Sequence, residues 1–233
     1  YQMFSHAKNK LEITALHLTV GPDVNPMHAD NFEEVSFGPI LYGAQKLNIP
    51  LRTRYEISNN AGQDICAIAN REGYDFLLVG SGISLSDLPA DVEANRYLRY
   101  FSKRILGIFR SPGELFYPGE LLKDKTKTFI EQSNCPVGVF VNRKFVRATN
   151  TLIVEGEEKD SFLQQYADNL RRTTNTECTT LKLSEIPLSE CRLSDYNFML
   201  ISYPTWNKIS ESEKEALQQM PSTLILSQGM TNV

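Results

Sequence analysis

The chain of 233 residues has no run near the roughly 18 to 20 apolar residues that a membrane-spanning helix requires. It also lacks the basic and apolar segments of a secretory signal at its N-terminus. Its net charge is −4, and the absence of a basic excess argues against a nucleic-acid-binding protein. We therefore expect these residues to be soluble by themselves and to bind no nucleic acid.

Cysteine and histidine are scarce. The 4 cysteines stand far apart without CxxC spacing, which favours a reduced compartment over a disulfide framework. The 3 histidines, His6, His17 and His28, lie near no cysteine, so the sequence holds no zinc motif. His17 lies inside an apolar strand pattern, where a histidine is more often part of a core than a catalytic base. No GxSxG or other nucleophile motif is present, and we expect no enzyme activity.

The sequence does contain a regular alternation of strand and helix patterns, which predicts α/β modules built on open parallel sheets. In the helix pattern of residues 32–47, Gly38-Pro39 is an interruption that can make the first part a separate turn. Gly73 stands where a helix over 61–72 would end. The first half is predicted to contain strands at 11–20, 51–57, 74–82 and 136–142 and helices at 32–47, 61–72 and 121–132.

Residues after Arg147 repeat this theme in shorter form. YDFLLVGSG at 74–82 resembles YNFMLISYP at 196–204, and CPVGVFVN at 135–142 resembles MPSTLILSQ at 220–228. We predict two related modules, 1–145 and 146–233, the second of them shortened and degenerate. The second half is predicted to contain strands at 150–155, 177–183, 196–202 and 222–227 and helices at 159–173 and 211–219.

An insertion at about 84–118 interrupts the first module and includes an amphipathic helix predicted over 91–109. No acidic residue occurs from Ala94 to Gly113, and an apolar stripe recurs at helical spacing. Such a helix suits an anionic lipid surface or a partner helix, or it packs on the sheet of its own domain. The basic residues of the insertion are Arg96, Arg99, Lys103, Arg104 and Arg110.

The turn Gly80-Ser81-Gly82 is the best candidate for ligand binding. It follows a strand, and ligands of doubly wound sheets lie at the carboxyl ends of strands. Glycine also lets backbone N–H groups approach phosphate oxygens closely. The alternative interpretation, a tight turn without a ligand, remains open.

The segments ALHLTV (15–20), VGSG (79–82) and CPVGVFVNR (135–143) resemble the universal stress protein module. The resemblance implies a five-stranded parallel sheet in the order 3-2-1-4-5. It also implies ATP or AMP as cofactor, with Gly80 to Gly82 at the phosphates and the backbone of Thr19 and Val20 at the adenine. Residues 1–10 have the pattern of the last turns of the first helix, so we expect the first strand upstream of them. We therefore interpret the chain as a fragment of a longer polypeptide. The alternative is a trimmed N-terminus. Ser202-Tyr203-Pro204 contains no glycine, and we expect no nucleotide in the second module.

A truncated first module and a degenerate second one are similar to the cytoplasmic C-terminal region of bacterial cation:proton antiporters of the monovalent cation:proton antiporter-2 family. This resemblance implies a regulatory region at the cytoplasmic face of the inner membrane, joined to a membrane transport domain in the same polypeptide. It also implies pairing of two copies through Val137–Val141. Two alternatives remain: a free-standing tandem universal stress protein that binds ATP or AMP, and an enzyme of the adenine-nucleotide hydrolase class.

Overall fold

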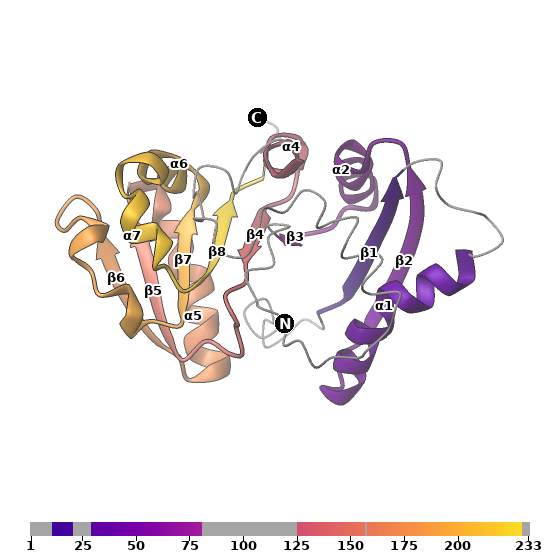
Figure 1. Cartoon of the computed structure of the whole chain (residues 1–233), viewed down its shortest axis with the longest axis horizontal. Coiled ribbons are helices and arrows are strands. Elements are labelled where there is room, and N and C mark those ends of the chain that lie inside the picture. The colour runs from indigo at the N-terminus through magenta and orange to yellow at the C-terminus, as the bar shows by residue number, and fades with distance from the viewer. Residues whose placement is uncertain (1–10, 21–28, 81–124, 157, 230–233) are drawn as a thin grey trace.

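The computed structural model describes residues 11–20, 29–80, 125–156 and 158–229, and these residues form two β-sheets (Figure 1). The predicted insertion with its five basic residues, and Ser81 and Gly82 of the predicted ligand turn, lie outside the described residues. The architecture is α/β with mostly parallel strands, which confirms the fold class predicted from the sequence.

The smaller sheet consists of β1 (Ile13–Val20) and β2 (Leu51–Ser58), which run parallel with Ile13 opposite Leu51. The helix that connects them, α1 (Ala29–Lys46), runs through Pro39 without a break, so the predicted interruption is wrong. A proline removes one backbone donor, and an α-helix can continue past that single loss at a cost in stability.

The next helix, α2 (Ala61–Glu72), has the predicted bounds because both of its ends carry strong local signals. The Asn60 side chain accepts a hydrogen bond from the backbone N–H of Gln63, which caps the first turn. Gly73 ends the helix in the left-handed conformation with φ of 66°.

The larger sheet has six strands and joins the two halves of the sequence. All neighbouring strands in it are parallel except β4 and β8, which pair antiparallel. The strand order is β3 (Leu77–Gly80), β4 (Val137–Val141), β8 (Ser222–Ser227), β7 (Phe198–Ser202), β5 (Asn150–Glu155) and β6 (Glu177–Lys182).

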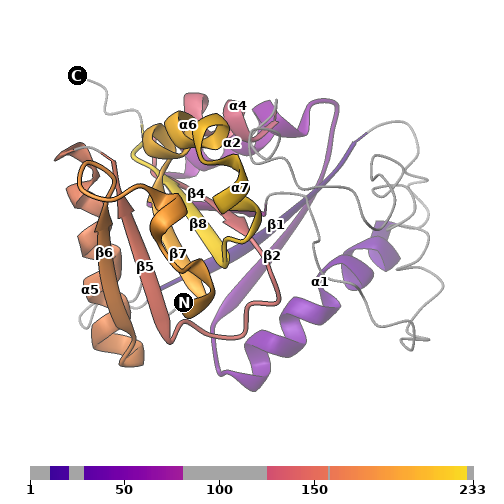
Figure 2. The same cartoon turned by 60° about the vertical axis from the view of Figure 1, so that its left-hand side comes forward.

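Helices cover both faces of this sheet (Figure 2). One face packs on α4 (Lys125–Gln132), α6 (Tyr203–Ser212) and α7 (Lys214–Gln218), with Trp206 of α6 fully buried among the strands. The other face packs on α5 (Leu163–Thr174), which follows a short 3-10 helix, η3 (Glu158–Phe162). Two further 3-10 turns, η4 (Leu188–Glu190) and η5 (Leu193–Asp195), lead from β6 to β7.

Several elements differ from their predictions. β3 contains only four residues, and Leu78 within it is 54% exposed, so the prediction of a fully buried strand over 74–82 is wrong in length and burial. The helix predicted over 211–219 is two helices, and the first of them, α6, begins at Tyr203. The missed signal was Ser202, whose side chain caps α6 by accepting a hydrogen bond from the Thr205 N–H.

The connection between β4 and β5 contains the predicted boundary at residues 145 and 146, and it is anchored on both sides. Arg143 donates hydrogen bonds to the carbonyl oxygens of Gln218 at 2.5 Å and Met220 at 3.0 Å. Phe145 packs against Phe198 with ring centroids 5.1 Å apart. The large sheet therefore continues across this boundary.

Both edges of β4 are paired within the chain, with β3 on one side and β8 on the other. A second copy therefore has no free edge at Val137–Val141 to pair with. The implied pairing through this strand instead occurs within the chain, with β8, the last strand of the second module. Dimerisation by another surface stays a prediction.

The smaller sheet is attached to the larger one through α2, which lies beside α4 in both views (Figures 1 and 2). Asn70 of α2 donates to the Gln132 carbonyl oxygen at 2.9 Å and accepts from the Asn134 N–H at 2.8 Å. Cys66 of the same helix is buried in the core of the larger sheet. One helix thus carries contacts to both sheets.

We predict that Gly138→Val destabilises the fold by about 1–3 kcal/mol, because a Cβ at this position would lie 2.6 Å from Cζ of Phe76 and 3.1 Å from Cδ1 of Leu224. Urea denaturation measures the effect. The control is Gly62→Ala, whose Cβ would meet no atom closer than 3.6 Å and which should leave the stability unchanged or slightly higher. Equal stabilities of the two variants would contradict the proposed packing of Phe76 across β4.

Candidate functional site

The strand order of the second half predicts a crevice beyond the carboxyl ends of two strands of the larger sheet. From β5 the chain continues through α5 to β6 on one side, whereas β7 lies on the other side of β5. In parallel α/β sheets, ligands bind beyond the carboxyl ends of the two strands where the order reverses in this way. The corresponding position here lies beyond Glu155 of β5 and Ser202 of β7.

This crevice is filled by side chains of the protein itself. Asp160, which follows β5 and is only 2% exposed, accepts a hydrogen bond from the Gly156 N–H at 2.8 Å. The same carboxylate oxygen accepts from the hydroxyl of Thr205, in the first turn of α6, at 2.6 Å. A Cβ at Gly156 would lie 2.5 Å from that hydroxyl oxygen, so the two segments approach as closely as a glycine allows.

A backbone N–H, a hydroxyl and a helix N-terminus are the donors with which such crevices hold a phosphate group. Here these donors face a resident carboxylate, so an anionic ligand would have to displace Asp160. This arrangement gives a structural reason for the expectation that the second module binds no nucleotide. No sequence pattern predicts this contact, because Asp160 and Thr205 are 45 residues apart.

Of the predicted nucleotide-site residues, the described part contains Thr19, Val20 and Gly80, which lie on strands of different sheets. Thr19 and Val20 are the last residues of β1 and pair with Ile57 and Ser58 of β2. Gly80 is the last residue of β3 and pairs with Phe140 of β4. The nucleotide site at Thr19, Val20 and Gly80 to Gly82 therefore stays a prediction.

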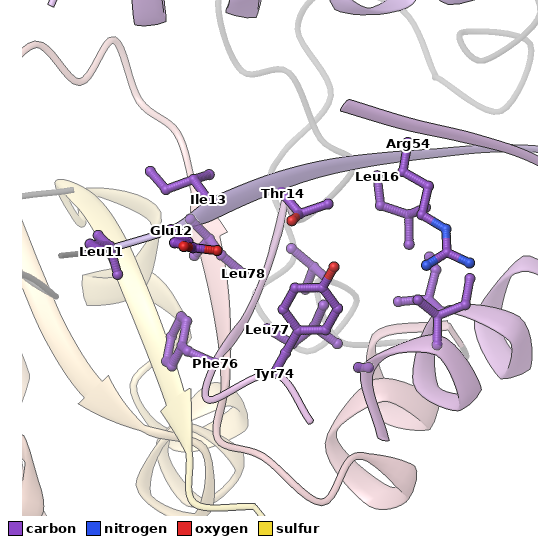
Figure 3. A pocket seen from close by; sticks show the side chains of 14 residues that line it. Leu11, Glu12, Ile13, Thr14, Leu16, Arg54, Tyr74, Phe76, Leu77 and Leu78 are labelled. Atoms are coloured by element: carbon purple, nitrogen blue, oxygen red, sulfur yellow. The ribbon is translucent and has the colours of Figure 1, made fainter. Parts of the chain in front are cut away.

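A second candidate is a pocket of about 270 Å³ between β1, α2 and β3 (Figure 3). Figure 3 shows β1 along one side of it, with Phe76, Leu77 and Tyr74 facing β1 from the other side. The lining is largely apolar, and Arg54 of β2 lies at one end. The apolar side chains that line it include Leu11, Ile13, Leu16, Ile65, Ile68 and Leu77.

The charge of Arg54 at this pocket is already paired. Its guanidinium contacts the carboxylates of Glu56 on β2 and Glu72 at the end of α2. The hydrogen bond from Arg54 lowers the pKa of Glu72 below its ordinary value. Because two carboxylates surround the single guanidinium, no unpaired positive charge faces the pocket, which favours an apolar occupant over an anion.

On β1, His17 belongs to an aromatic cluster. Its ring stacks on Tyr55 of β2 with centroids 5.6 Å apart and meets the edge of Phe37 of α1 at 6.3 Å. Partial burial lowers the pKa of His17 below its ordinary value of 6.5, so the neutral ring is favoured in the fold. This agrees with the interpretation of His17 as a core residue.

Metal and thiol chemistry find little support in the described residues. They contain no group of three or more His, Cys, Asp or Glu residues that could hold a metal ion. All four cysteines are free, and burial raises the pKa of the Cys66 and Cys135 thiols. A raised thiol pKa reduces the thiolate fraction, which makes both cysteines poor nucleophiles.

Comparison with known proteins identifies the fold but no family. No family model and no curated protein matches the chain. Among solved structures, a universal stress protein from Archaeoglobus fulgidus aligns over 94% of this chain and 86% of its own, with 12% identity and a TM-score of 0.51. A functionally unknown protein from Pseudomonas aeruginosa aligns over 93% and 92%, with 10% identity and a TM-score of 0.49. The first likeness shows that the chain has a universal stress protein-like α/β fold.

We predict that Asp160→Ala lowers the free energy of unfolding by about 1–3 kcal/mol, since it leaves the half-buried Gly156 N–H and the buried Thr205 hydroxyl without this acceptor. Urea denaturation checks it. Asp168→Ala is the matched control, because Asp168 pairs with Arg171 at 2.8 Å on the surface and its loss should cost less than about 0.5 kcal/mol. A loss for Asp160→Ala no larger than the control's would show that the crevice does not depend on this carboxylate.

We also predict a pH effect that depends on His17. Its pKa is lower in the folded state, so below about pH 6.5 the unfolded chain binds more protons and the fold loses stability as the pH falls. His17→Phe should remove this component, so the difference in urea midpoint between about pH 5.5 and about pH 7.5 should shrink in the variant. An NMR titration should place the pKa of His17 below 6.5. The same pH difference in variant and parent, with an ordinary titration, would refute the assignment.

Proposed function

We propose that this chain is a regulatory domain of a cation:proton (Na⁺/H⁺) antiporter, with a universal stress protein-like fold and no catalytic role of its own. In this proposal the domain lies at the cytoplasmic face of the inner membrane and is continuous with a membrane transport domain of the same polypeptide. It senses pH or a nucleotide and biases the conformation of the transporter.

The observation that carries this proposal is the exposed apolar surface around α1. Such patches commonly mark surfaces that another protein or domain covers. Side chains of this kind suit a domain that packs against another part of a larger protein. The large apolar residues exposed here are Ile40, Leu41, Tyr42 and Leu47.

A pH signal has a direct route to this surface. His17 meets Phe37, and Phe37 lies on α1 one turn before Ile40 and Leu41. Protonation of His17 opposes its partial burial and would loosen the contact with α1. A signal of this kind changes the conformational equilibrium of the transporter only if α1 binds the two conformations of the transporter with different affinity. A nucleotide at the end of β3 would act by the same principle.

Ion transport itself would reside elsewhere in the polypeptide. Among the helices of the described residues, none combines the length and the apolar character needed to cross a bilayer. The proposal therefore assigns the ion pathway to an upstream membrane domain and assigns only its control to this chain.

Fractionation of native cells, probed with an antibody to this region, tests the proposal. We expect a membrane-bound band much heavier than 26.4 kDa, because transporter and regulatory domain share one polypeptide. Washing the membranes with high salt and with carbonate is the control, since a peripheral protein would be released. A soluble band near 26.4 kDa would overturn the antiporter proposal, and nucleotide binding by a free-standing protein would become the leading hypothesis.

A further inference from the structure

A pocket of about 440 Å³ lies where the two halves of the chain meet. The antiparallel pairing of β4 with β8 brings the carboxyl end of β4 to the amino ends of β8, β7 and β5, and the pocket is at this edge of the sheet. It is lined by the segment between β4 and β5 and by residues at the start of β7 and β8. The pocket is therefore separate from the crevice beyond β5 and β7, which belongs to the opposite edge.

The lining of this pocket contains three basic residues and no acidic one. Arg143, Lys144 and Arg147 place three positive charges within five residues of a chain whose net charge is −4. Lys144 and Arg147 are exposed, and within the part of the chain that the structure describes neither forms an ion pair with a carboxylate. Positive charges held this close together repel one another, and an anion between them relieves the repulsion.

The bend between Asn142 and Phe145 fixes the direction of Lys144. The Asn142 side chain accepts a hydrogen bond from the Phe145 N–H at 2.9 Å. The Phe145 ring packs against Phe140 and Phe198, with centroids 5.5 Å and 5.1 Å apart. Between these anchors Lys144 has φ of 59°, a left-handed conformation that lysine rarely adopts. The contacts on either side hold the backbone in this conformation, and the lysine side chain lines the pocket.

Asn197 fixes the other side of the pocket. Its amide group donates to the carbonyl oxygen of Arg147 at 3.0 Å and to the hydroxyl oxygen of Thr149 at 2.6 Å. Its carbonyl oxygen accepts from the N–H groups of Thr149 and Asn150. The side chain thereby uses both donor protons and both acceptor lone pairs inside the protein, so Asn197 positions this segment and does not bind a ligand.

Two hydroxyl groups of the lining have a proton left to donate. The Ser222 hydroxyl oxygen accepts from the Arg143 N–H at 2.8 Å, and that of Thr149 accepts from Asn197. No described residue accepts the proton of either hydroxyl. Ser222 is only 1% exposed, yet it lines the pocket, so an oxygen atom of an anion in the pocket can serve as the acceptor.

We propose that this pocket binds a small phosphorylated molecule, whose phosphate oxygens contact the Lys144 ammonium group, the Arg147 guanidinium and the two hydroxyl groups. A guanidinium presents a planar pair of N–H donors and an ammonium group presents a compact charge, and both suit phosphate. Tyr196 and Val146, which is 90% exposed, add apolar surface for the organic part of the ligand. The inference does not depend on the proposed antiporter function.

Isothermal titration calorimetry of the 233-residue chain with inorganic pyrophosphate at about 20 mM NaCl tests the inference. We expect saturable binding at one site that weakens as the NaCl concentration rises, because the contacts are ionic. Lys144→Asn and Arg147→Gln should each lower the affinity by about tenfold or more. The matched control is Lys182→Gln, which removes an exposed positive charge at the carboxyl end of β6, on the opposite edge of the sheet. It should leave the affinity unchanged.

Lys144→Asn separates binding from folding. Asparagine adopts the left-handed conformation more readily than lysine, so this variant should resist urea as well as the parent or slightly better while it loses affinity. In a nuclear magnetic resonance titration, pyrophosphate should shift the backbone amide signals of Lys144, Arg147 and Ser222 in the parent and should not shift them in the variant.

The absence of saturable pyrophosphate binding at low salt would overturn the inference. If the chain in that case adsorbed to phosphatidylglycerol vesicles through Lys144 and Arg147, the basic residues would serve a lipid surface. Pyrophosphate binding that both substitutions leave unchanged would place the anion elsewhere and would also overturn it. A Lys144→Asn variant that lost stability together with affinity would contradict the assignment of Lys144 to the ligand. The cell fractionation result has no bearing on these outcomes, because the calorimetry uses the isolated chain.

Discussion

The antiparallel pairing of β4 with β8 is the interaction on which the rest of the structure depends. Among the described strands, it is the pairing that joins the two halves of the chain in one sheet, with Val139 opposite Ile225 at its centre. Both of these residues are completely buried, so the hydrogen-bonded ladder and the core on one face of the sheet form together. The hydrogen bonds of Arg143 and the ring contact of Phe145 then hold the segment after β4 against the rest of the second half.

This pairing also decides where ligands could bind. Since β4 and β8 run in opposite directions, the carboxyl ends of β3 and β4 lie at one edge of the sheet and those of β5 and β7 at the other. Gly80 and Asp160 therefore belong to opposite edges, and the two halves cannot share one crevice. At the edge near Asp160, the protein's own hydrogen bonds occupy the position where a ligand of such a sheet would bind.

Sequence patterns predicted the elements that depend on local signals. The bounds of α2, β5 and β8 agree with their predictions because caps, turns and apolar runs act within a few residues. The burial of β3 was predicted wrongly because YDFLLVGSG looks like a central strand, whereas burial depends on a neighbour that one edge of β3 lacks in the described residues. The contact of Asp160 with Thr205 could not be predicted, since it depends on how β5 and β7 are paired.

The exposed apolar side chains of α1 and the carboxylate at Asp160 fit the proposed regulatory role. In that role, a domain whose helix surface is covered by another part of the protein gains stability when that part docks, and by linkage it favours the conformation that docks best. Catalysis would require a rigid, completed site in the domain itself, whereas regulation requires only that docking and a signal compete for the same surface. The contact of His17 with Phe37 places a titratable group beside α1, and α1 carries the exposed apolar side chains, so proton binding and docking can be coupled through one helix.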